Sequence, residues 1–217
     1  MKIAIFDLDN TILNGDSDYS WINFLMDSSE VDRELYEERN LYFKTQYENG
    51  ELDFYEWAEF ALSAVKGKNI EEIEDLLHSF LSDVIEPMIN VYALRLIHKH
   101  IENNDFLILA SATYSLIVEP IGRRLGFKNI VSSDVETING KYTGRITGIP
   151  ALGEGKLIKV CNLIKKNNLD LKNATFYSDS INDLPLLDAV KNPIAVNPDR
   201  KLREIAIERN WDIEDLP

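Results

Sequence analysis

Two aspartates, Asp7 and Asp9, stand at positions i and i+2 directly after the apolar run 3–6. A short apolar run rich in β-branched and aromatic residues is typical of a buried strand, and side chains two residues apart on an extended chain lie on the same side. Two carboxylates this close repel each other unless a cation lies between them, and oxygen ligands suit a hard ion such as Mg²⁺. The pair therefore indicates metal-assisted chemistry, although an acidic turn would look the same in a tripeptide.

A second apolar run, 106–110, also ends in polar groups, here Ser111, Ala112 and Thr113. Small hydroxyl residues and free backbone N–H groups at a strand end, followed by a helix, can hold an anion. The same residues would also be suitable N-caps for the helix expected at 114–125. The pattern is thus consistent with an anion site and with simple capping.

A third run, 174–177, is followed by Asp179, Asn182 and Asp183. Because the carboxyl ends of parallel strands meet at one edge of an open α/β sheet, where ligands bind, we expect the three sets of polar groups to lie close together. Lys156 lies between the second and third sets, in the first turn of an expected helix, where a positive charge opposes the helix dipole. An unfavourable local charge is a functional candidate, although most exposed lysines are simply solvated.

The elements that must position these residues alternate between strands and helices. Such alternation predicts a doubly wound, mostly parallel α/β sheet with right-handed crossovers. Strands are expected at 3–6, 106–110, 130–131, 174–177 and 193–196, with a last helix opening at Asp199. Alternation around Asn139 and Gly140 predicts a β-hairpin within 134–148. Arg145 on this hairpin could face the site or the solvent.

Residues 16–85 differ in composition from the rest of the chain. They hold 18 of the 37 acidic residues and 5 of the 23 basic ones, which is a net charge of −13 out of −14. Helical periodicity is expected at 31–47, at 54–65 after the N-cap Asp53, at 70–81 after the N-cap Asn69, and again from Pro87 onward, with a break at Asn49-Gly50. We therefore expect a helical cap formed by residues 16–85, inserted into a core of residues 1–15 and 86–217.

The acidic composition also excludes classes of partner. Nucleic acids and anionic membranes are bound through clustered Lys and Arg, so neither is expected here. No apolar run approaches the ~18 residues of a membrane helix, and the N-terminus lacks the features of a signal peptide, so we expect a cytoplasmic protein. Its single cysteine, Cys161, lies in an apolar periodic pattern and is expected in the core. The oligomeric state is not predicted.

Taken together, the motifs resemble those of the haloacid dehalogenase superfamily of phosphohydrolases, and its phosphoserine-phosphatase-like branch in particular. The segment 6–11 matches the first motif (Asp-x-Asp-x-Thr), the segment 111–113 the second, Lys156 the third and the segment 178–183 the fourth. The resemblance covers nearly the whole chain, including the all-helical cap after the first motif. The four motifs in order are highly specific, whereas the match of the cap is looser.

The resemblance implies a Mg²⁺-dependent phosphatase acting on a small phosphomonoester. By resemblance, Asp7 is the nucleophile that becomes an aspartyl-phosphate, Asp9 is the general acid and then the base, and Lys156 neutralises negative charge. The implied metal site consists of Asp7, the carbonyl of Asp9, Asp179 and Asp183, the last orienting a metal-bound water or the lysine. The implied contacts to phosphate and substrate come from Thr11, Asp16, Ser111, Ala112, Thr113 and Asn182.

Other functions share parts of this pattern. A phospho-acceptor receiver module also uses an acidic cluster, Mg²⁺ and a lysine on a doubly wound sheet, but it lacks the second carboxylate at i+2 and the helical insertion. A phosphate-moving mutase of the same superfamily and a catalytically inactive interaction protein are further alternatives. The motifs do not exclude the mutase, whereas every chemically required position is filled, which argues against the inactive protein.

The substrate is expected to carry an amino or cationic alcohol group and no carboxylate. Phosphoserine phosphatases pair an acidic residue after the first motif with the substrate ammonium, a role open to Asp16, and a cap arginine with its carboxylate. The arginine position falls on Glu59 here, which would repel that carboxylate and attract a cation. Trp21, Tyr55 and Trp57 offer aromatic faces for a cation. Phosphoethanolamine, phosphocholine or histidinol phosphate would suit such a cap. The alternative is phosphoserine, with Arg33 or Arg39 supplying the arginine and the aromatics in the cap core.

Overall fold

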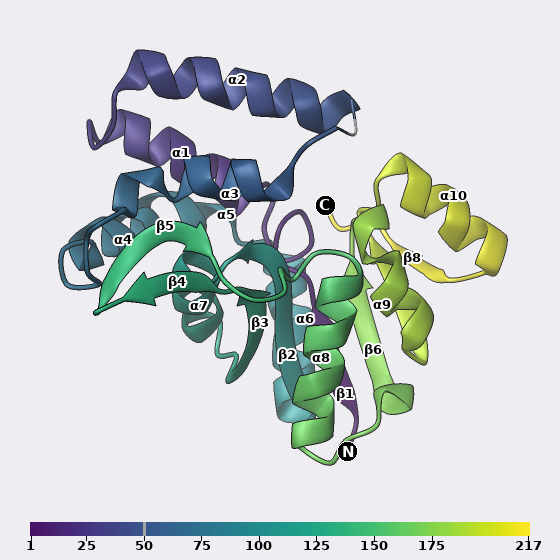
Figure 1. Cartoon of the computed structure of the whole chain (residues 1–217). Helices are drawn as coiled ribbons and strands as arrows, with labels where there is room; N and C mark the ends of the chain where they lie inside the picture. Colours follow the sequence, from purple (N-terminus) through teal and green to yellow (C-terminus); the bar gives the residue numbers. More distant parts are fainter. Residues whose placement is uncertain (50) are drawn as a thin grey trace.

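The computed structural model describes residues 1–49 and 51–217 and has an α/β core with a group of helices at one end (Figure 1). Its six-stranded sheet has the strand order β3-β2-β1-β6-β7-β8, and each described pairing is parallel. The strands are β1 (Ile3–Phe6), β2 (Phe106–Tyr114), β3 (Asn129–Ser133), β6 (Ala174–Ser178), β7 (Asn192–Val196) and β8 (Asp212–Glu214). The expected α/β fold is confirmed.

Strand β1 lies in the middle of the sheet, between β2 and β6, and its four residues are buried. Ile5 is in register with Ile108 on one side and Phe176 on the other, and successive side chains point to opposite faces. A strand covered on both faces reads as a continuous apolar run, which is why β1 was recognisable. Strand β8 was not expected, because it is a short, half-polar edge strand that pairs only with β7.

Helices cover both faces of the sheet. They are α6 (Val91–Glu102), α7 (Ser115–Arg124), α8 (Glu154–Lys166), α9 (Leu184–Ala189) and α10 (Arg200–Arg209). Ile5 belongs to the buried cluster that includes Val160 of α8 and Leu202 of α10, whereas Phe6 belongs to the one that includes Ile97 of α6 and Ile117 of α7. Cys161, expected in the core, is only partly buried on α8 and is a free thiol.

Between β1 and β2 the described residues form helices and turns. Besides α6, the helices are α1 (Ser17–Asp27), α2 (Arg33–Asn49), α3 (Phe54–Ala61), α4 (Glu74–Phe80) and α5 (Glu86–Met88), with a 3₁₀ helix at Ser63–Val65 and a π-helix at Leu81–Ile85. This agrees with a helical insertion after the first strand. Of the expected break at Asn49-Gly50, Gly50 lies outside the described residues. In the part of the chain described, no helix combines the length and apolarity needed to span a membrane.

Two of the expected helices are interrupted. The helix expected at 70–81 begins at Glu74, because Asn69 and Glu72 exchange backbone-to-side-chain hydrogen bonds of 2.8 and 3.0 Å and close a separate turn. The helix opened by Pro87 ends at Met88, and Asn90 then caps α6 by accepting a hydrogen bond of 2.9 Å from the Tyr92 N–H. Local side-chain hydrogen bonds therefore override the apolar periodicity.

The insertion packs directly on the core. Trp21, Phe43 and Phe80 of the insertion belong to the same buried cluster as Phe6 of the central strand. In Figure 1, α1, α2 and α3 lie together above the hairpin of β4 (Val135–Ile138) and β5 (Lys141–Ile146). The sheet and the helical insertion thus share one continuous apolar interior.

The hairpin at 134–148 is present as expected. Its turn residues Asn139 and Gly140 have φ of 53° and 76°, as a type I′ turn requires. Tyr142 of β5 exchanges backbone hydrogen bonds of 2.7 and 2.9 Å with Gly67 and Lys68, at the end of the segment that follows α3. The hairpin therefore supports the helical insertion from the core side.

Gly155 at the start of α8 allows a close backbone approach. A Cβ at this position would lie 2.0 Å from the Pro150 carbonyl oxygen and 2.9 Å from Ile149 Cγ2. We expect Gly155→Ala to lower the Tm by ~6–12 °C, since a clash with a backbone oxygen should cost ~3 kcal/mol, the upper end of the usual overpacking range, and each kcal/mol shifts Tm by ~2–4 °C in a chain of this size.

The matched control is Gly67→Ala. Gly67 has φ of +81°, but no atom lies within 4 Å of the position that an added Cβ would take, so only backbone strain of ~1 kcal/mol is expected. Differential scanning calorimetry gives the Tm of each variant, so the loss from a steric clash in Gly155→Ala can be compared with the loss from backbone strain in Gly67→Ala. Equal Tm losses in both variants would contradict the close approach at Gly155.

Candidate active site

The loop that follows β1 is folded back on itself and carries the first two acids. The Asp7 N–H donates to the Tyr177 carbonyl at 2.9 Å, which continues the pairing of β1 with β6 for one more residue. Beyond it, the Ile12 N–H donates to the Leu8 carbonyl at 2.8 Å, so the chain turns at once. Asp7 therefore lies at the carboxyl edge of the sheet, held by strand pairing on one side and a tight turn on the other.

Asp9 receives hydrogen bonds from two other elements. The backbone N–H of Ser17, at the start of α1, donates to Asp9 Oδ1 at 2.6 Å, and the hydroxyls of Ser111 and Thr113 donate to Oδ2 at 3.3 and 3.1 Å. A helix N-terminus favours negative charge, so α1 both positions and stabilises this carboxylate. The first and second sequence motifs thus meet at Asp9.

The segment Ser111 to Thr113 differs in structure from the expectation. Strand β2 continues to Tyr114, and α7 begins at Ser115 without a side-chain cap, so these residues are not the helix N-cap. The pairing of β2 with β3 shifts register between Ala110 and Tyr114, and this irregularity turns the two hydroxyls toward Asp9. The carbonyl of Ala112 accepts a hydrogen bond of 2.6 Å from Ser133.

Lys156 lies buried between two carboxylates. Its Nζ is 2.9 Å from Asp7 Oδ1 and 2.7 Å from Asp183 Oδ1, and its side chain is 3% exposed. Ser178 donates a further hydrogen bond of 2.7 Å to Asp183 Oδ2. The positive charge in the first turn of α8 therefore has a tertiary explanation, because the two carboxylates offset the unfavourable helix dipole. Both oxygens of Asp183 are engaged in this way, which favours its lysine-orienting role over direct metal contact.

Asp179 lies at the same edge and is held mainly through its backbone. Its carbonyl accepts a hydrogen bond of 2.7 Å from the Asp199 N–H, and its carboxylate accepts a long one of 3.3 Å from Thr11. The Asp199 side chain accepts from the Ile181 N–H at 2.7 Å and from the Leu202 N–H at 2.8 Å. Asp199 thus caps α10 and also fixes the loop that carries Asp179. Its place before a helix predicted the first role but not the second.

Two residues of the expected substrate site are present at the surface of this edge. Asp16 is the N-cap of α1, accepting a hydrogen bond of 2.8 Å from the Tyr19 N–H, and its side chain is exposed. Asn182 is also exposed, and its backbone N–H donates to Ser180 at 3.2 Å. Both remain candidates for contact with a substrate.

The acids of this edge carry more negative charge than Lys156 compensates. Burial, reinforced by neighbouring acids, raises the pKa of Asp7 to about 7 and that of Asp9 to about 6. Burial and then Asp7 raise the pKa of Asp179 to about 8. Burial acts to lower the pKa of Lys156, but Asp183 and Asp7 outweigh it and keep that pKa above its ordinary value, so the lysine stays charged. An added cation would relieve the remaining repulsion.

The oxygen atoms at this edge suit a hard cation, and one of them belongs to the backbone. Asp7 and Asp179 offer carboxylate oxygens, and Asp9 offers a carbonyl oxygen, all of which suit Mg²⁺. Among the described residues there is no group of three or more His, Cys, Asp or Glu side chains that could hold a metal ion. The implied Mg²⁺ site is consistent with this, because it needs only two carboxylates besides the carbonyl and water.

A further acid, Asp18, lies beside this edge and was missed by the sequence reasoning. Its Oδ2 accepts a hydrogen bond of 2.6 Å from Trp57 Nε1 of α3, and the residue is 7% exposed. Burial, with Asp16 as the next cause, raises the pKa of Asp18 well above its usual range. The sequence shows Asp18 only as an acid two residues after Asp16. An acid in the first turn of a helix is common, so its position alone did not indicate a functional role.

The expected substrate-facing carboxylate of the cap is not free. Glu59 pairs with Arg145 of β5 at 2.9 Å, and both side chains are more than half exposed. Arg145 therefore joins the hairpin to the cap, and the charge of Glu59 is balanced at the surface. Of the three aromatics, Trp57 binds Asp18, Trp21 is fully buried in the cap core, and Tyr55 is exposed.

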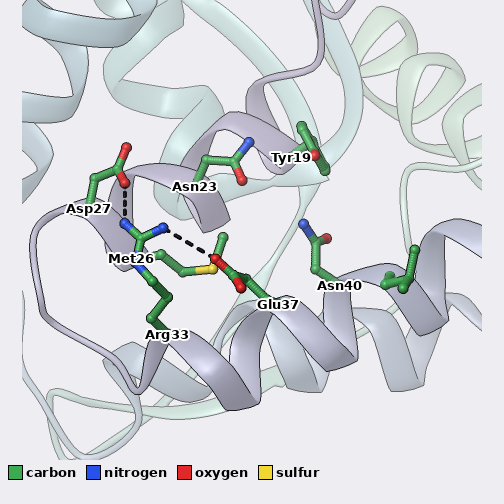
Figure 2. A pocket seen from close by; sticks show the side chains of 8 residues that line it. Tyr19, Asn23, Met26, Asp27, Arg33, Glu37 and Asn40 are labelled. Atoms are coloured by element: carbon green, nitrogen blue, oxygen red, sulfur yellow. Dashed lines mark hydrogen bonds and ion pairs between the residues drawn. The ribbon is translucent and has the colours of Figure 1, made fainter.

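The two arginines considered as substitutes lie elsewhere on the cap. Arg33 forms ion pairs with Asp27 at 2.5 Å and Glu37 at 3.2 Å (Figure 2). These residues border a pocket of about 360 Å³ between α1 and α2, which is lined by Tyr19, Asn23, Met26, Asp27, Arg33, Glu37, Asn40 and Leu41. Arg39 is exposed and lies over the rings of Tyr42 and Phe43.

At 100° per residue, the α1 residues that line the pocket in Figure 2 lie roughly 80° to 180° around the helix from Asp18, so the pocket borders a different face of α1. The pocket is therefore not part of the acidic edge. In the described part of the chain, neither Arg33 nor Arg39 contacts a residue of that edge.

Comparison with known proteins gives a consistent picture. The family model of the haloacid dehalogenase-like hydrolases matches residues 4–188. A histidinol-phosphatase of Neisseria meningitidis is 36% identical over 216 residues, covering 98% of this chain and 97% of its own. A phosphoserine phosphatase of Mycobacterium tuberculosis is 30% identical over 221 residues, covering 98% and 70%.

Solved structures agree with the fold. A protein of unknown function from Bordetella pertussis superposes with a TM-score of 0.94 at 39% identity, over 99% of this chain and 98% of its own. A phosphoserine phosphatase carrying an analogue of the phospho-aspartyl intermediate superposes with a TM-score of 0.70 at 18% identity, over 100% and 93%, which supports the fold alone. These findings rule out the receiver module. The chain belongs to the haloacid dehalogenase-like hydrolases and is a phosphoric monoester hydrolase with phosphoserine-phosphatase-like architecture.

Proposed function

We propose that this enzyme is a Mg²⁺-dependent phosphatase that hydrolyses the phosphomonoester of a small amino-bearing, cationic alcohol, with histidinol phosphate as the favoured substrate. The observation that carries the chemical part is the convergence of Asp7, Asp9 and Lys156 at one sheet edge, with Lys156 Nζ 2.9 Å from Asp7 Oδ1. A buried ammonium beside a nucleophilic carboxylate lets an anionic substrate approach it.

Asp7 is the nucleophile in this proposal. Its carboxylate attacks phosphorus and displaces the alcohol, so that an aspartyl-phosphate forms and the bond from phosphorus to the alcohol oxygen breaks. Lys156 holds Asp7 in place and offsets negative charge on the phosphoryl group. Ser111 is close enough to Asp9, at 3.3 Å, to serve the phosphoryl oxygens on the same side.

Asp9 is suited to move the proton. Burial raises the pKa of Asp9 to about 6, so at neutral pH a useful fraction of it carries the proton that the leaving alkoxide needs. After the alcohol departs, the same carboxylate accepts a proton from the water that attacks the aspartyl-phosphate. The hydrogen bonds from Ser17 and Thr113 keep its two oxygens in position through both steps.

Asp7, Asp179 and the carbonyl of Asp9 would hold Mg²⁺, with Asp183 acting on Lys156. When bound, the ion supplies electrostatic stabilisation of the phosphoryl oxygens and removes the repulsion between the two carboxylates. The raised pKa values of Asp7 and Asp179 support this assignment, because they mark negative charge that Lys156 alone does not balance.

The substrate class rests on the charges around the site. Asp16 and Asp18 lie next to Asp9, and they suit a leaving alcohol that bears positive charge. Phosphoserine is the second candidate, since one relative at 30% identity carries that name. It is the weaker one, because the cap arginines Arg33 and Arg39 are engaged elsewhere among the described residues and Glu59 is paired with Arg145. The relative at 36% identity is named a histidinol-phosphatase, which agrees with a cationic alcohol.

Phosphate release from a panel of phosphomonoesters tests the substrate class. We expect kcat/KM to be highest for histidinol phosphate, lower for phosphoethanolamine and phosphocholine, and lowest for phosphoserine, whose carboxylate meets uncompensated acids. The separation between the first and the last should be at least ~10-fold, which corresponds to about 1.4 kcal/mol. A preference for phosphoserine would contradict the proposed class.

The two leading carboxylates should respond differently to mutation. Asp7→Asn should abolish turnover, because an amide is a poor nucleophile. Asp9→Asn should slow turnover by ~10²–10⁴-fold. A substrate with a good leaving group should still phosphorylate this variant, because that step then needs no proton, but the aspartyl-phosphate should hydrolyse slowly for lack of the base. Steady-state and burst kinetics with 4-nitrophenyl phosphate measure both. Asp27→Asn, at the far end of α1, serves as the charge-matched control, and wild-type turnover by Asp7→Asn would exclude the mechanism.

The raised pKa values predict how stability depends on pH and Mg²⁺. Asp7, Asp9 and Asp179 have folded-state pKa values of about 7, 6 and 8, against an unfolded value near 3.9. Between those values the folded state binds more protons than the unfolded state, so the free energy of unfolding falls as the pH rises.

We therefore expect the Tm of the metal-free protein to drop between about pH 5 and pH 8.5, by of order 5 °C. Millimolar Mg²⁺ should recover most of this loss at the higher pH, because the ion binds the ionised folded state. Differential scanning calorimetry with EDTA or Mg²⁺ measures both effects. A Tm that is independent of Mg²⁺ at pH 8.5, or full activity after exhaustive EDTA treatment, would contradict the metal site.

A further inference from the structure

A group of buried polar atoms at the start of α1 has no hydrogen-bond partner. The atoms are Ser17 Oγ, Asp18 Oδ1, Trp21 Nε1 and the Tyr114 hydroxyl, and within the described residues none of them has a hydrogen-bond partner within 3.5 Å. The Ser17 and Tyr114 hydroxyls still lie near enough to Asp9 and Asp18, respectively, to lower the pKa of those carboxyls as weaker, longer donors. Ser17, Trp21 and Tyr114 have no exposed surface, and Asp18 is 7% exposed. Buried polar groups are nearly always paired, so several orphans in one place indicate partners that the chain itself does not supply.

These atoms lie together in space. On α1, Trp21 follows Asp18 by three residues and Ser17 by four, so its side chain neighbours both of them on the helix surface. Tyr114, from the end of β2, lies close enough to Asp18 that each affects the pKa of the other. Trp57 reaches the same place from α3 and donates to Asp18 Oδ2 at 2.6 Å. The group is formed by the two cap helices and the core strand that carries Ser111 and Thr113.

The group adjoins the side of the site where the alcohol leaves. Ser17 belongs to it through its side chain, and its backbone N–H donates to Asp9 Oδ1 at 2.6 Å. Asp9 also contributes to the raised pKa of Asp18, which places the two carboxylates within electrostatic range. A leaving group attached to phosphorus at Asp7 and protonated by Asp9 would extend toward this group.

A purely structural role does not account for Asp18. Holding the Trp57 indole requires one acceptor, which a neutral amide or hydroxyl would provide without burying a charge. The carboxyl group is instead buried with no close partner for Oδ1 and only a longer contact to the Tyr114 hydroxyl, and burial, Asp16 and Asp9 act against its ionised form. Such a locally unfavourable arrangement is typical of a binding site, where residues needed for function lower the stability of the fold.

We propose that Asp18, together with Trp57 and Tyr114, forms a subsite for a second nitrogen-bearing cationic group of the substrate alcohol, separate from the ammonium taken by Asp16. The inference deepens the proposed function and rests on it. Asp18 Oδ1 needs an N–H donor, and a protonated nitrogen supplies both the donor and the opposite charge. The Tyr114 hydroxyl can accept or donate, and the two aromatic rings favour a cation or a planar ring such as imidazole.

Asp16 and Asp18 differ in a way that suits two groups of one substrate. Asp16 is exposed at the start of α1, whereas Asp18 is buried two residues further on. A short alcohol with a single ammonium group satisfies Asp16 and leaves Asp18 unpaired. An alcohol with an amino group and a second, distal nitrogen group pairs both, so it should be discriminated strongly from the single-nitrogen analogue.

The experiment compares Asp18→Asn with the wild-type enzyme on three substrates. Histidinol phosphate has two nitrogen groups, phosphoethanolamine has one, and 4-nitrophenyl phosphate has none that is cationic. We expect Asp18→Asn to lower the ratio of kcat/KM for histidinol phosphate to kcat/KM for 4-nitrophenyl phosphate at least tenfold, mainly through KM. The ratio for phosphoethanolamine to 4-nitrophenyl phosphate should change less than threefold. Asp27→Asn, which removes one acid from the opposite face of α1, should leave both ratios within twofold.

Stability provides a second, independent readout. If Asp18 is a binding residue, Asp18→Asn should have the same Tm as the wild type or a higher one, because an unpaired buried charge is removed while the acceptor for Trp57 is kept. Histidinol alone should raise the Tm of the wild type more than that of the variant. Trp57→Phe keeps the ring but loses the donor to Asp18, and it should weaken the selectivity ratio in the same direction.

The outcomes separate the two proposals. A wild-type enzyme that hydrolyses 4-nitrophenyl phosphate but shows no preference for any cationic phosphomonoester overturns the proposed substrate class and the subsite together. A wild-type preference for histidinol phosphate that Asp18→Asn leaves unchanged overturns the subsite only. Equal loss on all three substrates, or a lower Tm in Asp18→Asn, also overturns it, because either result indicates a structural role.

Discussion

The ion pair of Lys156 with Asp7 and Asp183 is the interaction on which the site depends. A buried ammonium alone would be very costly, and so would two buried carboxylates, but together they are mutually stabilising at 2.7 to 2.9 Å. The three residues come from the end of β1, the first turn of α8 and the loop after β6. The ion pair can therefore form only once the sheet is assembled. Once formed, the ion pair holds these three segments in one geometry.

The same arrangement leaves an excess of negative charge at the sheet edge. One lysine faces Asp7, Asp9, Asp179 and Asp183, and the raised pKa values of the first three record the excess. A protein selected only for stability would remove some of these acids. Their presence is understandable if the site must hold a divalent cation, which would offset the negative charge of the acids and also that of an approaching phosphoryl group.

The helical insertion contributes in a different way from the core. Core residues at strand ends are held by the sheet, whereas Asp16 and Asp18 are held by the first turn of α1, and Trp57 by α3. In the proposed function, the sheet edge carries out the phosphoryl chemistry and the cap recognises the alcohol. The ion pair of Glu59 with Arg145 and the hydrogen bonds of Tyr142 link this cap to the hairpin, and so fix α3 relative to the core.

Those parts of the structure that depend on residues close together in the chain were predictable from local patterns. The apolar runs of β1, β2 and β6, the turn at Asn139-Gly140, and the order of the acidic and hydroxyl motifs are local patterns, and parallel strands bring their carboxyl ends together whatever the details. This is why the convergence of Asp7, Asp9 and Lys156 was predictable. The edge strand β8 was not predictable, because it is short and half polar. The interruptions at Asn69 and Asn90 were not predictable either, because local side-chain hydrogen bonds override the weak apolar periodicity there.

Which charged groups lie at the site depends on long-range packing and could not be predicted from local patterns. Asp18 and Glu59 look alike in sequence, as acids on amphipathic helices, yet one is buried beside Asp9 and the other pairs with Arg145 at the surface. Likewise, Asp199 positions Asp179 from a helix that begins twenty residues later. The physical reason is that helix rotation and packing are set by contacts between residues far apart in the chain, which no periodicity along the chain records.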